Sequence, residues 1–415
     1  MQSSFDRRTA LILAAGASLV GMLVAFAPAQ PQPPAPPRAG APPVNPPPAM
    51  PGAPVAAAPK VAAVPNAPGY PTEIGGRKLE DWVKDIDSPD PSVRAHAIQI
   101  VVEFGPSARK ALPAITRQVK QLNDLSPQAY AIIALAELVP MAPPTPPGGA
   151  PDPYTTDAVN ALIAELRNPE AVIRFRAATA LGYIGPPARA AVSDLIKRID
   201  DRMSWEIRKA ACFALGTVAR DEQNWPMTVA LEALSNGVAD RESKDVRLEA
   251  LQSVIRLGQP APQTTLPRLG NMLKQRLTAE RDKVVVLWVR VAMMALDVNQ
   301  RTDKNVEAVA KDLKSTDAEL RVAAARALGL MGPAAKNAVQ DVIDALPKAT
   351  DPILAVELCR ALGRMGQFAE RSVALLESMD KHSDAGVKLA AKIAIDDIKR
   401  AVDFAKQQPP QPPKR

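Results

Sequence analysis

The stretch Asp317–Ile343 reads DAELRVAAARALGLMGPAAKNAVQDVI, and the earlier stretch Glu170–Ile196 reads EAVIRFRAATALGYIGPPARAAVSDLI. Aligned without a gap, the two agree at fourteen of twenty-seven positions, and most of the differences exchange similar residues. Such self-similarity is typical of proteins in which each unit packs mainly against its neighbours. We therefore expect the body of the chain to be one repeat array rather than several globular domains.

The fifth residue of each copy is an arginine, and it sets the register of the array. Aligning the chain on this anchor position gives nine units, although the sixth can also be shifted by one residue to Arg290. The anchor residues are Arg94, Gln128, Arg174, Arg208, Arg247, Val289, Arg321, Ala355 and Lys388.

Each unit has the signals of a helical hairpin. An acidic or small polar residue usually stands four positions before the anchor and is suited to a helix N-cap, and apolar residues follow at helical spacing. Glycine, often followed by proline, ends this first helix and begins the second. These glycines, eleven residues after their anchors, are Gly105, Gly185, Gly258, Gly332 and Gly366.

The pattern D-x-x-[VIL]-R-x-x-A-A-x-A-L-G-x-[IM]-G-P-x-A resembles the HEAT-like repeat that is also found in bilin lyases. The resemblance implies an all-α solenoid of about nine HEAT-like helical hairpins over residues 79–404, with the second helices on the concave side. Long β-branched runs and hairpin turn pairs are missing, which also favours an all-helical body. The motif says little about activity, because the family includes scaffolds, adaptors and a few enzymes.

The amino-terminal segment has the order of an export signal. Arg7 and Arg8 precede an uncharged apolar run over residues 9–27, and small residues at cleavage-like spacing follow. We expect residues 1–29 to be a signal peptide or, if they are not cleaved, a membrane anchor that contacts the bilayer through residues 9–27. Either form predicts an exported protein of the bacterial periplasm or cell envelope.

Proline-rich segments flank the repeats. Seventeen of the forty-four residues from Pro28 to Pro71 are proline, and only Arg38 and Lys60 among them are charged. We expect residues 30–72 to be a disordered linker that acts as an extended spacer, and residues 405–415 to be a disordered proline-rich tail.

Charge argues against nucleic acid as the partner. The chain has a formal net charge of +7, but residues 79–407 contain 43 basic and 42 acidic residues. A solenoid that binds phosphate backbones is expected to carry a concentrated positive face. We therefore expect a protein or a polyanionic polymer as the partner.

The sequence has no obvious catalytic or metal-binding constellation. Cys212 and Cys359 occupy positions where sister units carry alanine, and they lie several repeats apart. The histidines His96 and His382 have no neighbouring His or Cys at ligand spacing, and the chain contains no His-Glu pair. We predict no enzymatic activity, no metal and no cofactor.

Two features suggest partner contacts. Arg109, Arg189 and Lys336 each stand fifteen residues after an anchor, where the sequence predicts the first turn of the second helix. Cations are mildly disfavoured there by the helix dipole, so the recurrence indicates either pairing with an adjacent unit or contact with an acidic partner on the concave side. The other feature is Trp225 in the loop RDEQNWPM, either as a binding anchor or as a cover for the repeat edge.

Taken together, these features predict a non-enzymatic interaction scaffold that binds a partner along the solenoid. The alternative is a chromophore-handling protein or enzyme resembling the bilin lyases. Those proteins act in the cytoplasm, whereas the amino-terminal segment predicts export.

Overall fold

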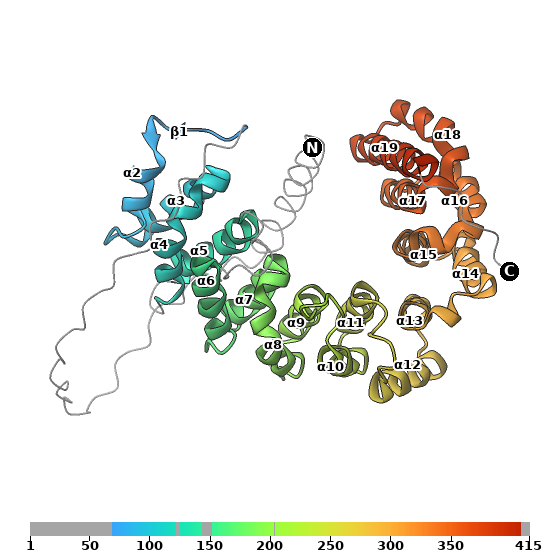
Figure 1. Cartoon of the computed structure of the whole chain (residues 1–415), viewed down its shortest axis with the longest axis horizontal. Helices are drawn as coiled ribbons and strands as arrows, with labels where there is room; N and C mark the ends of the chain where they lie inside the picture. Colours follow the sequence, from blue (N-terminus) through green and yellow to red (C-terminus); the bar gives the residue numbers. More distant parts are fainter. Residues whose placement is uncertain (1–68, 122–124, 143–151, 203, 408–415) are drawn as a thin grey trace. The chain divides into compact units, whose positions relative to one another are not determined.

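The structure is a computed structural model that describes residues 69–121, 125–142, 152–202 and 204–407. Its contacts divide the chain into two units, which meet between Ala180 and Leu181 and are described separately. Most of the described residues are helical, which confirms the all-α expectation (Figure 1). The predicted export segment and most of the predicted linker lie outside the described residues. Within the described ranges, no helix is long and apolar enough to cross a membrane.

Unit 1 alternates first and second helices behind a small amino-terminal hairpin. First helices are those that contain an anchor residue, and short 3-10 segments (η) often join them to the second helices. The elements are β1 (Glu73–Ile74), β2 (Arg77–Lys78), α2 (Leu79–Asp85), α3 (Pro91–Val102), η1 (Gly105–Ala111), α4 (Leu112–Val119), α5 (Leu125–Leu138), η2 (Val139–Met141), α6 (Pro153–Glu165) and α7 (Ala171–Ile184), whose last turn belongs to unit 2.

Unit 2 continues the same alternation. Its odd-numbered helices are first helices and its even-numbered helices are second helices. The elements are η3 (Pro186–Ala191), α8 (Val192–Ile199), α9 (Trp205–Val218), α10 (Thr228–Val238), α11 (Lys244–Leu257), α12 (Pro267–Ala279), α13 (Lys283–Leu296), η4 (Val298–Gln300), α14 (Asp303–Lys311), η5 (Asp312–Lys314), α15 (Ala318–Met331), η6 (Gly332–Ala338), α16 (Val339–Ala345), η7 (Leu346–Lys348), α17 (Pro352–Met365), η8 (Gly366–Ser372), α18 (Val373–Ser378), η9 (Met379–Lys381) and α19 (Ala385–Gln407).

The anchor arginines hold the turn that precedes their own helix. The guanidinium of Arg321 donates to the carbonyl oxygens of Ser315 and Thr316, at 2.8 and 3.0 Å. Equivalent bonds are made by Arg94, Arg174, Arg208 and Arg247. Gln128 does the same with its amide, which donates to Val119 O at 2.8 Å. The side chain therefore satisfies carbonyl groups that the helix ladder leaves unpaired.

Side-chain caps confirm most of the predicted helix starts, and they correct the sixth. Asp317 accepts from the backbone of Glu319 and Leu320, four residues before its anchor. In the sixth unit Asp282 caps α13 in the same way. The equivalent anchor is therefore Val286, three residues before the predicted Val289. The shift was missed because valine repeats through this stretch and no arginine marks the register.

The glycines at the ends of the first helices have the predicted left-handed backbone. Their φ angles lie between 54° at Gly332 and 75° at Gly258, a region that side chains other than glycine rarely adopt. After these glycines the chain forms 3-10 segments before several of the second α-helices begin. The junction is thus longer than the direct glycine-proline start that the sequence predicts.

The first helices of unit 2 lie on its inner side, as Figure 1 shows for α9 to α19, and the even-numbered helices lie outside. The prediction that second helices line the concave side is therefore wrong. The reason lies in the small residues of the first helices. A Cβ atom added at Gly329 would lie 3.2 Å from Ala361 Cα, and one added at Gly363 would lie 2.9 Å from Ala394 Cα. Because α15, α17 and α19 approach so closely, the array curves toward them.

The amino-terminal end of unit 1 is closed by a hairpin that the sequence analysis missed. Strands β1 and β2 pair antiparallel through Gly75 and Gly76, whose φ angles of 60° and 72° suit a two-residue turn. The indole of Trp82 donates to Ile74 O at 3.3 Å, and the Arg77 guanidinium lies 4.1 Å from its ring centre. The folded body therefore begins before residue 79.

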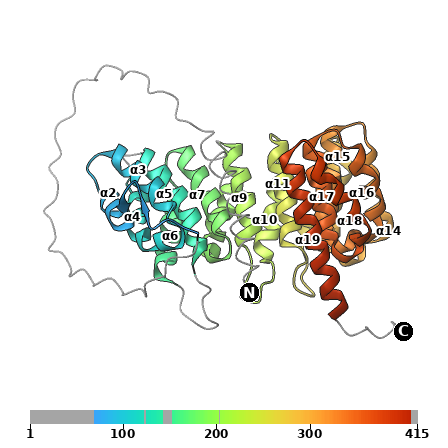
Figure 2. The ribbon, with the colours of Figure 1, turned by 90° about the horizontal axis from the view of Figure 1, so that it is seen from above.

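The carboxy-terminal end is a single long helix. The ninth anchor lies in α19, which has no second helix after it within the described chain, so the ninth unit is a half-hairpin. Figure 2 shows α19 extending beyond its neighbours toward the C-terminus. The helix continues to Gln407, three residues into the predicted tail.

Candidate functional site

Arg109 is a buried structural residue. Its guanidinium donates to the carbonyl oxygens of Leu138 and Val139, both at 2.9 Å, and pairs with the carboxylate of Asp152. Burial lowers the pKa of Arg109, although the nearby Asp152 acts in the opposite direction. Because the side chain is only 8% exposed, a partner cannot reach it, and the predicted partner contact must be corrected for this residue.

Arg189 and Lys336 remain accessible, but each also contacts a side chain of the following repeat. Arg189 lies 3.4 Å from the Glu222 carboxylate, with both side chains largely exposed. The Lys336 ammonium lies 5.8 Å from the ring centre of Phe368. Exposed contacts of this kind contribute little to stability, so either side chain is available to a partner.

The helical position of these three cations differs from the prediction. Arg109, Arg189 and Lys336 lie in the last turns of η1, η3 and η6 rather than in the first turn of an α-helix. Each of these segments runs directly into the following α-helix, which begins at Leu112, Val192 or Val339, so the three cations still precede a second helix.

Trp225 lies in a loop that is fixed to the next unit. Arg220 donates to the carbonyl oxygens of Arg256 and Leu257 at 3.1 and 2.8 Å, and Asp221 accepts from the backbone N–H of Trp225 at 2.8 Å. Trp225 is 40% exposed. The loop presents Trp225 on an ordered backbone, which keeps it as a candidate contact.

A more extensive surface covers the inner side of α15, α17 and α19. We call it the C-terminal inner face and define it by seven exposed side chains. They recur at helical spacings of four and seven residues, so those of each helix share one side. The set is Arg326, Leu330, Ile353, Arg360, Arg364, Leu389 and Ile393.

One carboxylate joins two helices of this face. The side chain of Glu357 is 8% exposed and accepts from Arg326 at 3.0 Å and from Arg360 at 3.2 Å. Both arginines keep about half of their side-chain surface exposed, at 43% and 55%. Arg364 has no carboxylate within ion-pair distance in the described part of the chain. Two guanidinium groups therefore share one buried carboxylate, and Arg364 adds a third positive charge on the same helix as Arg360.

This face was not predicted from the sequence. Arg326 and Arg360 both stand five residues after their anchors, and Arg364 stands nine residues after its own. The sequence therefore contained a recurring arginine position in these two repeats. This recurrence gained significance only once the side chains at those positions were seen to be exposed on first helices.

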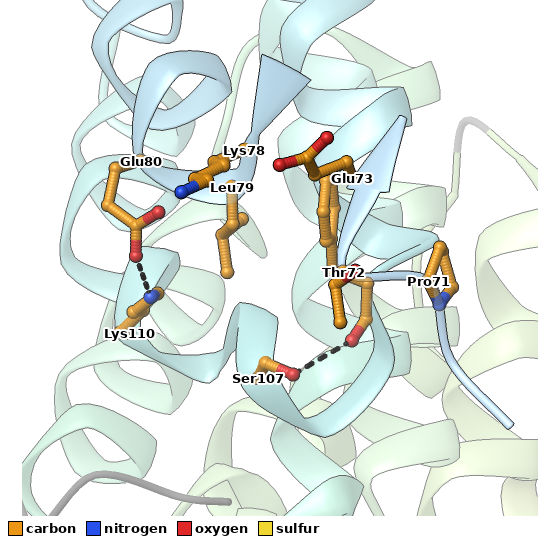
Figure 3. A pocket seen from close by; sticks show the side chains of 9 residues that line it. Pro71, Thr72, Glu73, Lys78, Leu79, Glu80, Ser107 and Lys110 are labelled. Carbon is orange, nitrogen blue, oxygen red and sulfur yellow. Dashed lines mark hydrogen bonds and ion pairs between the residues drawn. The ribbon is translucent and has the colours of Figure 1, made fainter. Parts of the chain in front are cut away.

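A pocket of about 410 Å³ lies at the amino-terminal end of unit 1 (Figure 3). Its polar lining is electrically balanced, because Glu73 and Glu80 oppose Lys78 and Lys110. Glu80 is paired with Lys110, and this hydrogen bond lowers the pKa of the carboxyl. An ionised, paired carboxylate is a poor proton donor at neutral pH, so the pocket does not suggest acid catalysis.

The cysteines and histidines have structural environments. Burial raises the pKa of the Cys212 thiol, and it raises that of Cys359 to about 11, so neither is a thiolate at neutral pH. His96 meets the Trp82 ring edge-on, and His382 Nδ1 accepts from the backbone of Asp384 at 3.0 Å. The described residues contain no group of three or more His, Cys, Asp or Glu side chains that is placed to hold a metal ion.

Comparison with known proteins places the fold in a class. A family model of HEAT repeats matches residues 159–255 and 306–396. The chain is a HEAT-like repeat protein. No curated protein matches it.

Several solved helical-repeat structures are similar at low identity. The complex of CpcE and CpcF of phycocyanin lyase from Nostoc sp. PCC7120 is 18% identical, with 80% of this chain and 100% of that chain covered and a TM-score of 0.42. Importin beta is 14% identical, with 78% and 46% covered and a TM-score of 0.42. A designed armadillo repeat protein in complex with the peptide (KR)4 is 21% identical, with 53% and 99% covered and a TM-score of 0.40. Similarities at this level of identity and TM-score say nothing about the activity of the chain.

Proposed function

We propose that the protein is a non-enzymatic scaffold of the bacterial cell envelope that binds a partner protein along its repeat surface. The observation that supports it is the C-terminal inner face. Ile353 and Leu389 are 61% and 59% exposed there, although the apolar side chains behind them are buried. Extended surfaces of this kind suit a macromolecular partner, whereas a small ligand needs an enclosing cavity.

Location in the envelope is part of the proposal and rests on the sequence of residues 1–29. Its test is a fusion of residues 1–70 to a reporter that is active only outside the cytoplasm. We expect an active reporter, and an inactive one would contradict export.

Binding can be tested by site-specific photo-crosslinking in the full chain. A crosslinking residue placed at Leu330 or Leu389 on the inner face, or at Trp225 in its loop, is compared with one at Val229, which is exposed on the outer helix α10. We expect the same protein to be crosslinked at two or more of the first three positions and not at Val229. Crosslinks at none of these positions, together with retention of a tetrapyrrole, would replace the scaffold with the chromophore-handling alternative.

A further inference from the structure

We propose that the C-terminal inner face binds a protein segment that combines carboxylates with apolar side chains. This inference rests on the proposed scaffold function and names the chemistry of its partner. It follows from three properties of the face, which are its exposed guanidinium groups, its exposed apolar side chains and the continuity of its three helices.

The charge of the face calls for carboxylates. Arg326 and Arg360 are held in place by Glu357, but each leaves part of its guanidinium fork unused, since only one contact to the carboxylate is made by each. Arg364 lies four residues after Arg360 and adds a further positive charge on the same side of α17. Guanidinium groups recognise carboxylates in a planar, often bidentate geometry.

The apolar side chains distinguish a protein segment from a simple polyanion. Leu330, Ile353, Leu389 and Ile393 are between 44% and 61% exposed. A polyphosphate or a nucleic acid backbone has no group to cover them. A segment with apolar side chains would remove this area from water, which is the main source of affinity in most protein associations.

The three helices form one continuous surface. In unit 2, α17 packs between α15 and α19, and all three lie on its inner side (Figure 1). The contact of Gly329 with Ala361 and that of Gly363 with Ala394 keep the helices at short separation. A single extended or helical segment can therefore touch arginine and apolar positions of neighbouring helices at once.

The chain's own outer segments do not have the required chemistry. Residues 1–68 contain one acidic residue, Asp6, and residues 408–415 contain none but carry Lys414 and Arg415. Their charge is not complementary to the face. The occupant we infer is therefore a segment of a different protein.

The test is a binding titration of the full chain with fluorescent peptides. The probe is a sixteen-residue amphipathic peptide of Glu and Leu, compared with one in which Lys replaces Glu and one in which Ser replaces Leu. We expect only the Glu/Leu peptide to bind well. Arg364→Glu and the double change Ile353→Ser with Leu389→Ser should each raise its Kd by about tenfold, which corresponds to about 1.4 kcal/mol.

Matched control variants lie on outer helices. Lys311→Glu reverses an exposed charge on α14, and Val229→Ser removes an exposed apolar side chain on α10. Both should leave the Kd within about twofold. Helical circular dichroism of every variant should match that of the native chain, since all the changes are at exposed positions.

The inference would be overturned if the inner-face variants bound the Glu/Leu peptide with the Kd of the native chain, or if the Lys/Leu peptide bound as tightly as the Glu/Leu peptide. It would also be overturned if polyphosphate bound with a Kd that the Ile353→Ser and Leu389→Ser pair does not change, because the ligand would then be a polyanion. Sedimentation showing a dimer that these variants dissociate would make the occupant a second copy. If crosslinking captures a protein while the acidic peptide fails to bind, the scaffold stands and only the partner class is wrong.

Discussion

The ammonium group of Lys244 lies 2.8 Å from a carboxylate oxygen of Glu319, seventy-five residues further along the chain. Lys244 begins α11 and Glu319 lies in the first turn of α15, so the contact passes the intervening helix α13. The same ammonium lies 2.8 Å from Asp282, the N-cap of α13. Burial disfavours the charged lysine, but hydrogen bonds to Asp282 and Glu319 outweigh it and raise the pKa of Lys244. One side chain thus joins the first helices of three successive repeats, α11, α13 and α15.

This relationship predicts that Lys244 controls local curvature. In Lys244→Met the helices α11 and α15 should separate, because two carboxylates lose the cation between them. Spin labels at Arg241→Cys and Thr316→Cys measure the distance, and the buried Cys212 and Cys359 should not react. We expect a longer and broader distance distribution, with a loss of stability below about 1 kcal/mol because the groups are partly exposed. Lys209→Met breaks a pair between α9 and α11 and serves as the control. An unchanged distance would assign the curvature to backbone packing alone.

Arg109 and Arg189 should differ sharply in their effect on stability, although they occupy equivalent positions. Arg109→Ala removes a buried guanidinium, leaves two carbonyl oxygens without their donor and deprives Asp152 of its cation, so the free energy of unfolding should fall by about 2–3 kcal/mol. Arg189→Ala removes only an exposed contact to Glu222 and should cost less than about 0.5 kcal/mol. Urea denaturation of both variants gives the comparison. Equal losses would mean that the environments do not differ as described.

Glu165 should make stability depend on pH. Its carboxylate accepts from Gln128 and Asn168, but burial raises the pKa of the carboxyl above its ordinary value of 4.5. The folded state therefore binds the proton more tightly than the unfolded state. The contribution of Glu165 is most favourable below pH 4.5 and is lost as the pH rises through the folded pKa.

In Glu165→Gln that loss should be absent, because the amide oxygen can still accept both bonds and no charge has to be buried. Urea denaturation midpoints measured from pH 4 to pH 8 should show the stability of the variant increasing relative to that of the native chain as the pH rises. Glu73→Gln, at an exposed strand position, controls for the change in total charge. If the difference in stability between variant and native chain were the same at every pH, the pKa of Glu165 would not differ between the folded and unfolded states.

The close approach of the inner helices predicts opposite effects for two Gly→Ala changes. At Gly363 the added methyl would lie 2.9 Å from Ala394 Cα, so α17 and α19 must separate, at a cost of about 1–3 kcal/mol. Gly270 lies in α12 with nothing within 4 Å of an added Cβ. Gly270→Ala should stabilise by about 0.5–1 kcal/mol through helix propensity and a less flexible unfolded chain. Thermal unfolding of the two variants shows whether each change lowers or raises stability. If Gly363→Ala left the stability unchanged, close packing of these helices would not explain the inward curve.

Local signals in the sequence were sufficient for the units and their helices. N-cap residues such as Asp317 and left-handed glycines such as Gly332 act within one turn of the chain, and apolar spacing identifies the buried side of each helix. These signals predicted the nine first helices of the described chain, although the register of the valine-rich α13 was wrong by three residues. They did not predict the short hairpin at Gly75 and Gly76.

The tertiary structure decided what lies between units. Whether Arg109 is buried, which helices line the inner side, and whether Arg326 and Arg360 share Glu357 all depend on side chains from the next hairpin, about thirty residues away. Spacing along one helix gives the direction of a side chain but not the distance of the neighbour that it meets. That distance is set by the small residues where the first helices touch. It is therefore the packing of Gly329 on Ala361 and of Gly363 on Ala394, rather than any single motif, that brings the arginines and apolar side chains of the C-terminal inner face together.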